Sequence, residues 1–192
     1  MNIEYEATFA NINKDEIRER LKGVDAVCER SEYLQKRIPF HLPKEKRSDN
    51  AWLRVRDEGG NVTLSLKVID GDKIENQKEL LLHVDNFNTA VQLLEAIGCE
   101  SKSYQETNRE LWKLNDTEIT IDEWPFLEPF VEIEGNSEKA VRRVAEKLGF
   151  DWDNALFCAV GKLYEMKYGI PEKEINLAKK IVFGMENPFV KK

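Results

Sequence analysis

Short stretches in which apolar and polar residues alternate recur along most of the chain and predict β-strands. Near the N-terminus, apolar Ile3 and Tyr5 alternate with acidic Glu4 and Glu6. This period of two is typical of a strand with one face buried. Strands of this kind are predicted over residues 2–10, 27–40, 51–57, 62–69, 74–84, 103–114, 117–123 and 129–134.

Other segments have apolar residues at helical spacing. Asn13 and Ser137 are residue types that favour helix N-caps, and Gly98 and Gly149 stop the helices that precede them. Helices are therefore predicted over residues 13–22, 90–97, 137–149, 153–167 and 172–183. Because short turns join most of the strands, the pairing is expected to be antiparallel. The predicted class is α+β, with a sheet that can close on itself.

Composition narrows the function. The chain has 192 residues, 41% apolar and 34% charged, which fits one soluble globular domain. Its net charge of −7 disfavours a broad nucleic-acid surface. The three cysteines fit neither a disulfide framework nor a zinc site. No signal peptide or membrane span is recognisable, so we expect a cytoplasmic protein without a membrane or nucleic-acid partner.

The polar faces of the predicted strands are segregated by the sign of their charge. One strand carries Glu4 and Glu6, another carries Arg54 and Arg56, and a third carries acidic residues at 132 and 134. A sheet with one solvent-exposed face also alternates apolar and charged residues. For each strand taken alone, simple solvation of the charges is the favoured explanation. A sheet that is merely solvated tends to mix signs across neighbouring strands, however. Segregated signs suit a site that holds an anion together with its cation.

A triphosphate bound to a divalent metal ion is a ligand of this kind. Mg²⁺ and Mn²⁺ prefer carboxylate oxygens together with phosphate and water. Phosphate oxygens prefer guanidinium and ammonium donors. A closed barrel of about eight strands is wide enough to hold both sets of side chains around one small ligand.

Several motifs, taken in order, resemble the CYTH superfamily, which includes class IV adenylyl cyclases, thiamine triphosphatases and inorganic triphosphatases. The resemblance covers about residues 1–165. The motifs are Glu4-x-Glu6, Leu53-Arg54-Val55-Arg56, Leu66-Lys67, Glu79, Glu106-x-x-Arg109, Ile121-Asp122 and Phe130-Val131-Glu132-Ile133-Glu134.

The resemblance implies an eight-stranded antiparallel closed β-barrel, a tunnel, with flanking and C-terminal helices. Residues 1–168 would form the tunnel domain, and 169–192 a C-terminal helical extension of it. The resemblance implies Mg²⁺ or Mn²⁺ as cofactor, and its metal-binding residues would be Glu4, Glu6, Glu79, Asp122, Glu132 and Glu134. Phosphate-binding residues would be Arg54, Arg56, Lys67 and Arg109, with Lys67 also the candidate that helps activate water.

Two positions depart from the family pattern. Thr8 stands where the first motif usually continues to a lysine, and Thr107 stands where a further basic residue is common. Arg30, Lys36 or Arg37 could restore positive charge, but the sequence leaves open which of them faces the tunnel.

Three functions are compatible with this pattern. The leading hypothesis is a metal-dependent phosphohydrolase that acts on a small-molecule triphosphate: inorganic tripolyphosphate, a nucleoside triphosphate or thiamine triphosphate. The alternatives are a class IV adenylyl cyclase and a module that binds nucleotide or polyphosphate without turnover. Trp124 could stack on a base, although core packing is the favoured interpretation. The resemblance also leaves room for a homodimer.

Overall fold

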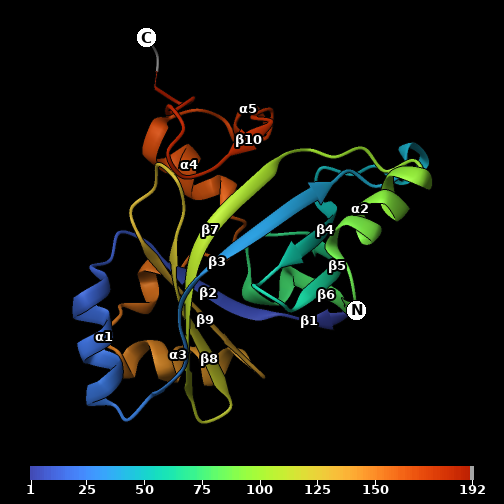
Figure 1. The fold of residues 1–192 in the computed structure, drawn as a ribbon. Helices are drawn as coiled ribbons and strands as arrows, with labels where there is room; N and C mark the ends of the chain where they lie inside the picture. The colour runs from blue at the N-terminus through green and yellow to red at the C-terminus, as the bar shows by residue number, and fades with distance from the viewer. Residues whose placement is uncertain (191–192) are drawn as a thin grey trace.

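A curved antiparallel sheet forms most of the molecule (Figure 1). The computed structural model describes residues 1–190 of the 192-residue chain. Its strands are β1 (Asn2–Ile3), β2 (Tyr5–Phe9), β3 (Val27–Phe40), β4 (Ala51–Asp57), β5 (Val62–Ile69), β6 (Gln77–Val84), β7 (Tyr104–Leu114), β8 (Thr117–Glu123), β9 (Phe130–Gly135) and β10 (Lys180–Ile181). The order in the sheet is β1-β6-β5-β4-β3-β7-β8-β9-β2, and β10 pairs in parallel with β7 outside this path.

The N-terminal segment nearly closes the sheet into a barrel. Strand β1 pairs with β6 and β2 pairs with β9, and only Glu4 separates β1 from β2. The Glu4 amide donates to the Gln77 carbonyl over 2.9 Å, and Gln77 Nε2 donates to the Glu6 carbonyl over 2.7 Å. The single strand predicted over residues 2–10 is therefore interrupted at Glu4. If β1 and β2 are counted as one strand, the barrel has the eight strands that were predicted.

Three helices pack against the outer face of the sheet, and the last two supply residues to the cavity of the barrel. The helices are α1 (Lys14–Gly23), α2 (Phe87–Ala96), α3 (Glu138–Lys147), α4 (Gly161–Tyr168) and α5 (Glu172–Ile175), with 3₁₀ turns at Lys44–Lys46, Ile74–Asn76 and Trp152–Asn154. The two predicted N-caps are confirmed, because Asn13 accepts from the amides of Asp15 and Glu16 and Ser137 accepts from Ala140. Within residues 1–190, no helix is long and apolar enough to cross a membrane.

The apolar core lies between the outer face of the sheet and these helices. Ile119 and Ile133 of the sheet pack with Leu21 of α1 and Val141 of α3, all of them fully buried. A smaller cluster under α2 includes Phe40, which is fully buried as well. Because the outward-facing residues form the core, the inward-facing polar residues of the strands are left to line the interior.

The C-terminal region corrects the predicted helices. The pattern at residues 153–167 yields a 3₁₀ turn and the shorter α4, and the pattern at 172–183 yields only α5 and then β10. Gly169, with φ of 64°, ends α4, and Pro171 precedes α5. Short elements prevail here because their apolar side chains pack into one cluster with strand residues of the barrel. This aromatic cluster contains Trp124, Phe130, Leu163, Tyr164, Ile175, Ile181 and Phe189.

Gln77 is expected to contribute to closure of the barrel. It is 3% exposed, and Gln77→Leu would leave the Glu6 carbonyl without its donor. The loss of this buried hydrogen bond should lower the free energy of unfolding by about 1–3 kcal/mol, measured by urea titration. Leu82→Gln, at a position of the same strand that is 62% exposed, is the control and should change it by less than about 0.5 kcal/mol. Equal stability of the two variants would contradict this role.

Candidate functional site

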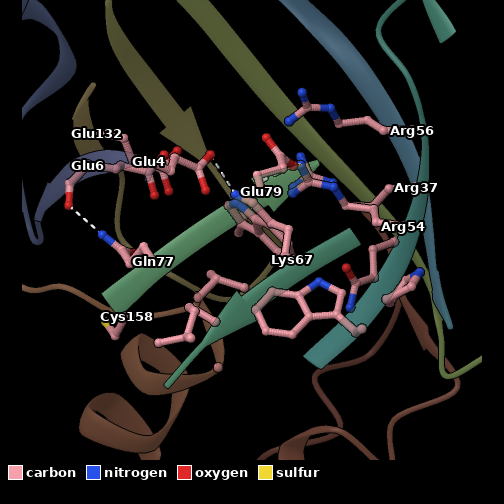
Figure 2. Close-up of a pocket in the computed structure, with 18 of the residues that line it drawn as sticks. Glu4, Glu6, Arg37, Arg54, Arg56, Lys67, Gln77, Glu79, Glu132 and Cys158 are labelled. Carbon is pink, nitrogen blue, oxygen red and sulfur yellow. Dashed lines mark hydrogen bonds and ion pairs between the residues drawn. The ribbon is translucent and has the colours of Figure 1, made fainter. Parts of the chain in front are cut away.

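A cavity of about 540 Å³ occupies the interior of the barrel. This volume lies within the range of small-molecule sites. Figure 2 shows that carboxylates gather on one side of the cavity and arginines on the other, with Lys67 and Glu79 between them. The segregation of charge by strand that the sequence indicates is therefore also a segregation in space.

The acidic wall consists of Glu4, Glu6, Glu132 and Glu134. Glu6 of β2 lies directly opposite Glu134 of β9 in the register of the sheet. One carboxylate oxygen from each of Glu4, Glu6 and Glu134 lies within 4.8 Å of the others. Like charges that face each other across strands are destabilising, so such a group is best explained by a cation. Three converging hard oxygen ligands suit a divalent ion such as Mg²⁺ or Mn²⁺.

Two carboxylates of the acidic wall, those of Glu6 and Glu134, have raised pKa values. Burial, together with the neighbouring charges of Glu132 and Glu4, raises the pKa of Glu6 well above its ordinary value. Glu134 keeps some contact with solvent, but burial of its carboxylate and the charge of Glu4 raise its pKa to about 7. Burial acts in the same direction on Glu4, but Lys67 outweighs it and the pKa of Glu4 is lowered. Cation binding at this wall would therefore release protons.

The basic wall consists of Arg37, Arg54, Arg56 and Lys67, which lie on β3, β4 and β5. Nη2 of Arg54 lies 3.2 Å from a carboxylate oxygen of Glu79, and Nη2 of Arg56 lies 2.7 Å from one of Glu58. Burial and the charges of Arg54 and Arg109 lower the pKa of Arg56 to about 10. A buried guanidinium whose pKa falls in this way is repelled by its neighbours, and an anion in the cavity would relieve that repulsion.

Lys67 joins the two walls. Its Nζ donates to Glu4 over 2.8 Å and lies 4.0 Å from an oxygen of Glu79. Burial lowers the pKa of Lys67, but the carboxylates of Glu4, Glu6 and Glu79 together raise it by more, so the net shift is upward. The side chain is therefore an ammonium ion at neutral pH in the metal-free protein.

Arg109 is held from two sides by carboxylates. Its Nε donates to Asp122 over 2.7 Å and its Nη2 donates to Glu132 over 2.6 Å. Asp122 is fully buried and also accepts from the hydroxyl of Thr120 over 2.6 Å. Because its oxygens are already engaged, Asp122 acts as a support for Arg109.

The structure brings most of the predicted site residues to one cavity. All of them line it except Asp122, which lies behind Arg109. Of the six predicted metal-binding residues, Glu4, Glu6 and Glu134 converge, and Glu132 belongs to the same wall. Glu79 lies instead beside Arg54 and Lys67. The functional role of each residue remains a prediction.

Several cavity residues were not predicted. The C-terminal segment, residues 153–190, supplies Cys158, Tyr164 and Glu172, although no motif marks them. Burial raises the pKa of Cys158 to about 12, so its thiol is not a nucleophile at neutral pH. Among Arg30, Lys36 and Arg37, only Arg37 lines the cavity. Its guanidinium lies 4.6 Å from the ring of Trp124, which packs in the aromatic cluster and also lines the cavity.

The pKa of Glu134 predicts a pH-dependent stability in metal-free buffer. Between about pH 4.5 and 7 the folded protein holds a proton that the unfolded chain has released. The free energy of unfolding therefore decreases as the pH rises through this range. Glu134→Gln removes this loss, so its melting temperature should exceed that of the wild type by a margin that grows up to about pH 7 and then stays constant. Glu95→Gln, an exposed change on α2, is the control. A margin that is independent of pH would contradict the assignment.

Comparisons with known proteins agree with this geometry. A protein of Methanocaldococcus jannaschii, provisionally named an adenylate cyclase, is 26% identical over 147 residues, which cover 76% of this chain and 81% of that protein. A solved structure from Pyrococcus horikoshii OT3 matches with a TM-score of 0.69 at 22% identity, covering 83% of this chain and 98% of the other.

A third similar protein has been described by its activity. A Hippeastrum protein, provisionally named an adenylyl cyclase and described as having a dominant triphosphatase activity, matches with a TM-score of 0.57 at 14% identity, covering 88% of this chain and 99% of the other. At such identities the two solved structures establish the fold alone. The model of the CYTH domain matches residues 2–155. This match covers well over half of the sequence, and the protein therefore belongs to the CYTH domain family.

Proposed function

We propose that this protein is a metal-dependent phosphohydrolase that acts on a triphosphate bound in the barrel. The observation that carries the proposal is the division of one cavity into an acidic and a basic wall. A triphosphate with its metal ion has both signs of charge in one small ligand. Candidate substrates are inorganic tripolyphosphate, a nucleoside triphosphate and thiamine triphosphate.

Glu4, Glu6 and Glu134 would hold the metal ion, with Glu132 beside them. The donor set is all carboxylate, which fits Mg²⁺ or Mn²⁺. When bound, such an ion supplies neutralising charge and polarises a phosphoryl oxygen. We assign Glu79 and Asp122 a different role from the one predicted, because their oxygens hold Arg54 and Arg109 in place.

The cationic side chains would bind the phosphate groups. Arg54, Arg56 and Arg109 present forked donors, which match phosphate oxygens in geometry as well as in charge. Fixed cations stabilise the charge that moves toward the leaving oxygen during phosphoryl transfer. Lys67 is charged while it is paired with Glu4, so it can orient phosphate or donate a proton. Acting as the base that activates water would require it to lose its proton first.

A cyclase remains the second candidate, because the similar proteins from M. jannaschii and Hippeastrum bear that name. The description of the latter as predominantly a triphosphatase is the reason that we place hydrolysis first. The same walls would serve either reaction, with water or the ribose hydroxyl as the attacking group. A module that binds without turnover is the third candidate, motivated by threonine at positions 8 and 107.

Product analysis tests the proposal. The purified protein with Mg²⁺ or Mn²⁺ should release phosphate from at least one of tripolyphosphate, ATP and thiamine triphosphate. Glu6→Gln and Arg54→Gln should each lower kcat/KM by about 100-fold or more, since one removes a metal-binding carboxylate and the other a phosphate clamp. Lys36→Gln, which alters an exposed side chain, is the control.

Each alternative gives a different result in the same assay. Cyclic AMP and pyrophosphate from ATP would identify a cyclase. Tight binding of triphosphate by calorimetry, with neither product, would identify a binding module. No binding and no turnover for any of the substrates would refute the proposal.

A further inference from the structure

Arg37 is a buried cation without an acidic partner among the residues that the structure describes. It is 5% exposed, and among residues 1–190 no carboxylate oxygen lies within 4.0 Å of its guanidinium nitrogens. By contrast, Arg54, Arg56 and Arg109 each form an ion pair. An isolated buried charge is costly in free energy. A side chain in this situation normally has a ligand of opposite charge.

Neutral groups hold Arg37 in one position. Its Nη2 donates to the side-chain oxygen of Gln35 over 2.5 Å and to the hydroxyl of Thr107 over 2.6 Å. Gln35 and Thr107 are fully buried, and the ring of Trp124 lies against the guanidinium on one side. These contacts orient the side chain without neutralising it. The guanidinium is therefore preorganised, and its charge remains available to a ligand.

The surroundings of Arg37 increase the surplus of positive charge. Arg37 of β3 lies directly opposite Arg56 of β4, and Figure 2 shows Arg37, Arg54 and Arg56 together on one side of the cavity. Burial, followed by the charges of Arg54 and Arg56, lowers the pKa of Arg37 well below its ordinary value. The metal-free, ligand-free protein thus tolerates a repulsion that an anion would remove.

Unused hydrogen-bonding groups lie in the same part of the cavity. Among residues 1–190, the Nε atoms of all three arginines have no hydrogen-bond partner, and neither does the buried hydroxyl of Thr63, which lines the cavity from the adjoining strand β5. Buried polar groups are normally hydrogen-bonded. A phosphate group has several acceptor oxygens and could engage several of these donors at once.

We propose that Arg37, together with Arg54 and Arg56, forms a binding subsite for one phosphate group of the substrate. This inference rests on the proposed function and adds to it a role for Arg37, which the sequence left open among Arg30, Lys36 and Arg37. Arg37 supplies the charge, Arg54 and Arg56 add further guanidinium donors, and the hydroxyl of Thr63 on β5 completes the polar lining. Gln35 and Thr107 position Arg37 through its Nη2.

Binding of tripolyphosphate measured by calorimetry, without metal and with it, tests the assignment. Arg37→Gln should weaken binding by about 10- to 100-fold, because the subsite loses its unpaired charge. The same variant should melt at a temperature equal to or above that of the wild type, since it removes an uncompensated buried charge. Lys36→Gln removes a positive charge from the neighbouring, exposed position of the same strand and should bind within about twofold of the wild type.

A relocated charge separates an electrostatic role from a structural one. In the double variant Arg37→Gln with Thr107→Lys, the new ammonium would occupy the space beside the former guanidinium. This variant should recover at least about a third of the binding free energy that Arg37→Gln loses. Arg37→Lys keeps the charge but loses the forked donors of the guanidinium. Its affinity should lie between those of the wild type and Arg37→Gln. Recovery in both variants would support the phosphate subsite.

Other outcomes would overturn the proposal. If Arg37→Gln binds tripolyphosphate as the wild type does while the wild type hydrolyses a triphosphate, the Arg37 assignment fails and the proposed function stands. If Arg37→Gln melts at a much lower temperature or does not fold, the residue is structural and the assignment again fails. If the wild type neither binds nor hydrolyses any triphosphate, both the subsite and the proposed function fail.

Discussion

Repulsion between buried charges of the same sign is the interaction on which the rest of this structure depends. Glu6 faces Glu134 across one pair of strands, and Arg37 faces Arg56 across another. Both pairs lie along the cavity because every second residue of each strand points inward. The fold tolerates both walls because Lys67 and Arg109 link the basic and acidic groups where the walls meet. The charged groups that these ion pairs do not neutralise lie away from Lys67 and Arg109 and face the cavity.

Much of this arrangement could be predicted from sequence, since strand alternation is a local property. The bounds predicted for residues 51–57, 62–69 and 117–123 are those of β4, β5 and β8. Once these strands are known, alternation alone places Arg54, Arg56 and Lys67 on one face. Convergence of Glu4, Glu6 and Glu134 follows only when the sheet closes, and the family resemblance rather than the alternation predicted closure.

The inward orientation of Arg37 could not be derived by counting along the strand. Strand β3 has two irregularities in its pairing with β7, between Cys28 and Arg30 and between Arg30 and Tyr33. Each irregularity inserts one extra residue on β3 relative to β7. The two shifts cancel, but Val27 is apolar and 63% exposed, so it does not indicate which face lines the cavity. The sequence also did not indicate which charged side chains form ion pairs with each other. Asp122 looks like a metal-binding residue until the register places it beside Arg109.

The C-terminal segment supplies part of the cavity lining. Its residues Cys158, Tyr164 and Ile181 line the cavity, while its aromatic side chains pack against Trp124 and Phe130 of the barrel. The phenol of Tyr164 donates to the Pro125 carbonyl over 2.6 Å, which fixes the segment to the end of β8. Exclusion of water lowers the effective dielectric and strengthens each electrostatic interaction within the cavity. The covering segment therefore strengthens the repulsion between like charges in the cavity and also the attraction between these charges and a ligand.

The same segment helps to explain why position 8 does not carry a cation. Thr8 is 3% exposed, and its amide and carbonyl are hydrogen-bonded to Leu156 at the start of the segment. Thr8 also lies opposite Glu132, whose carboxylate already accepts from Arg109. A lysine here would be buried and would compete with Arg109 for that carboxylate. With threonine at position 8 and arginine at position 37, positive charge is absent from the acidic wall and added to the basic one. The cavity is thereby more strongly polarised, and this polarisation favours a ligand that brings a cation to one wall and phosphate oxygens to the other.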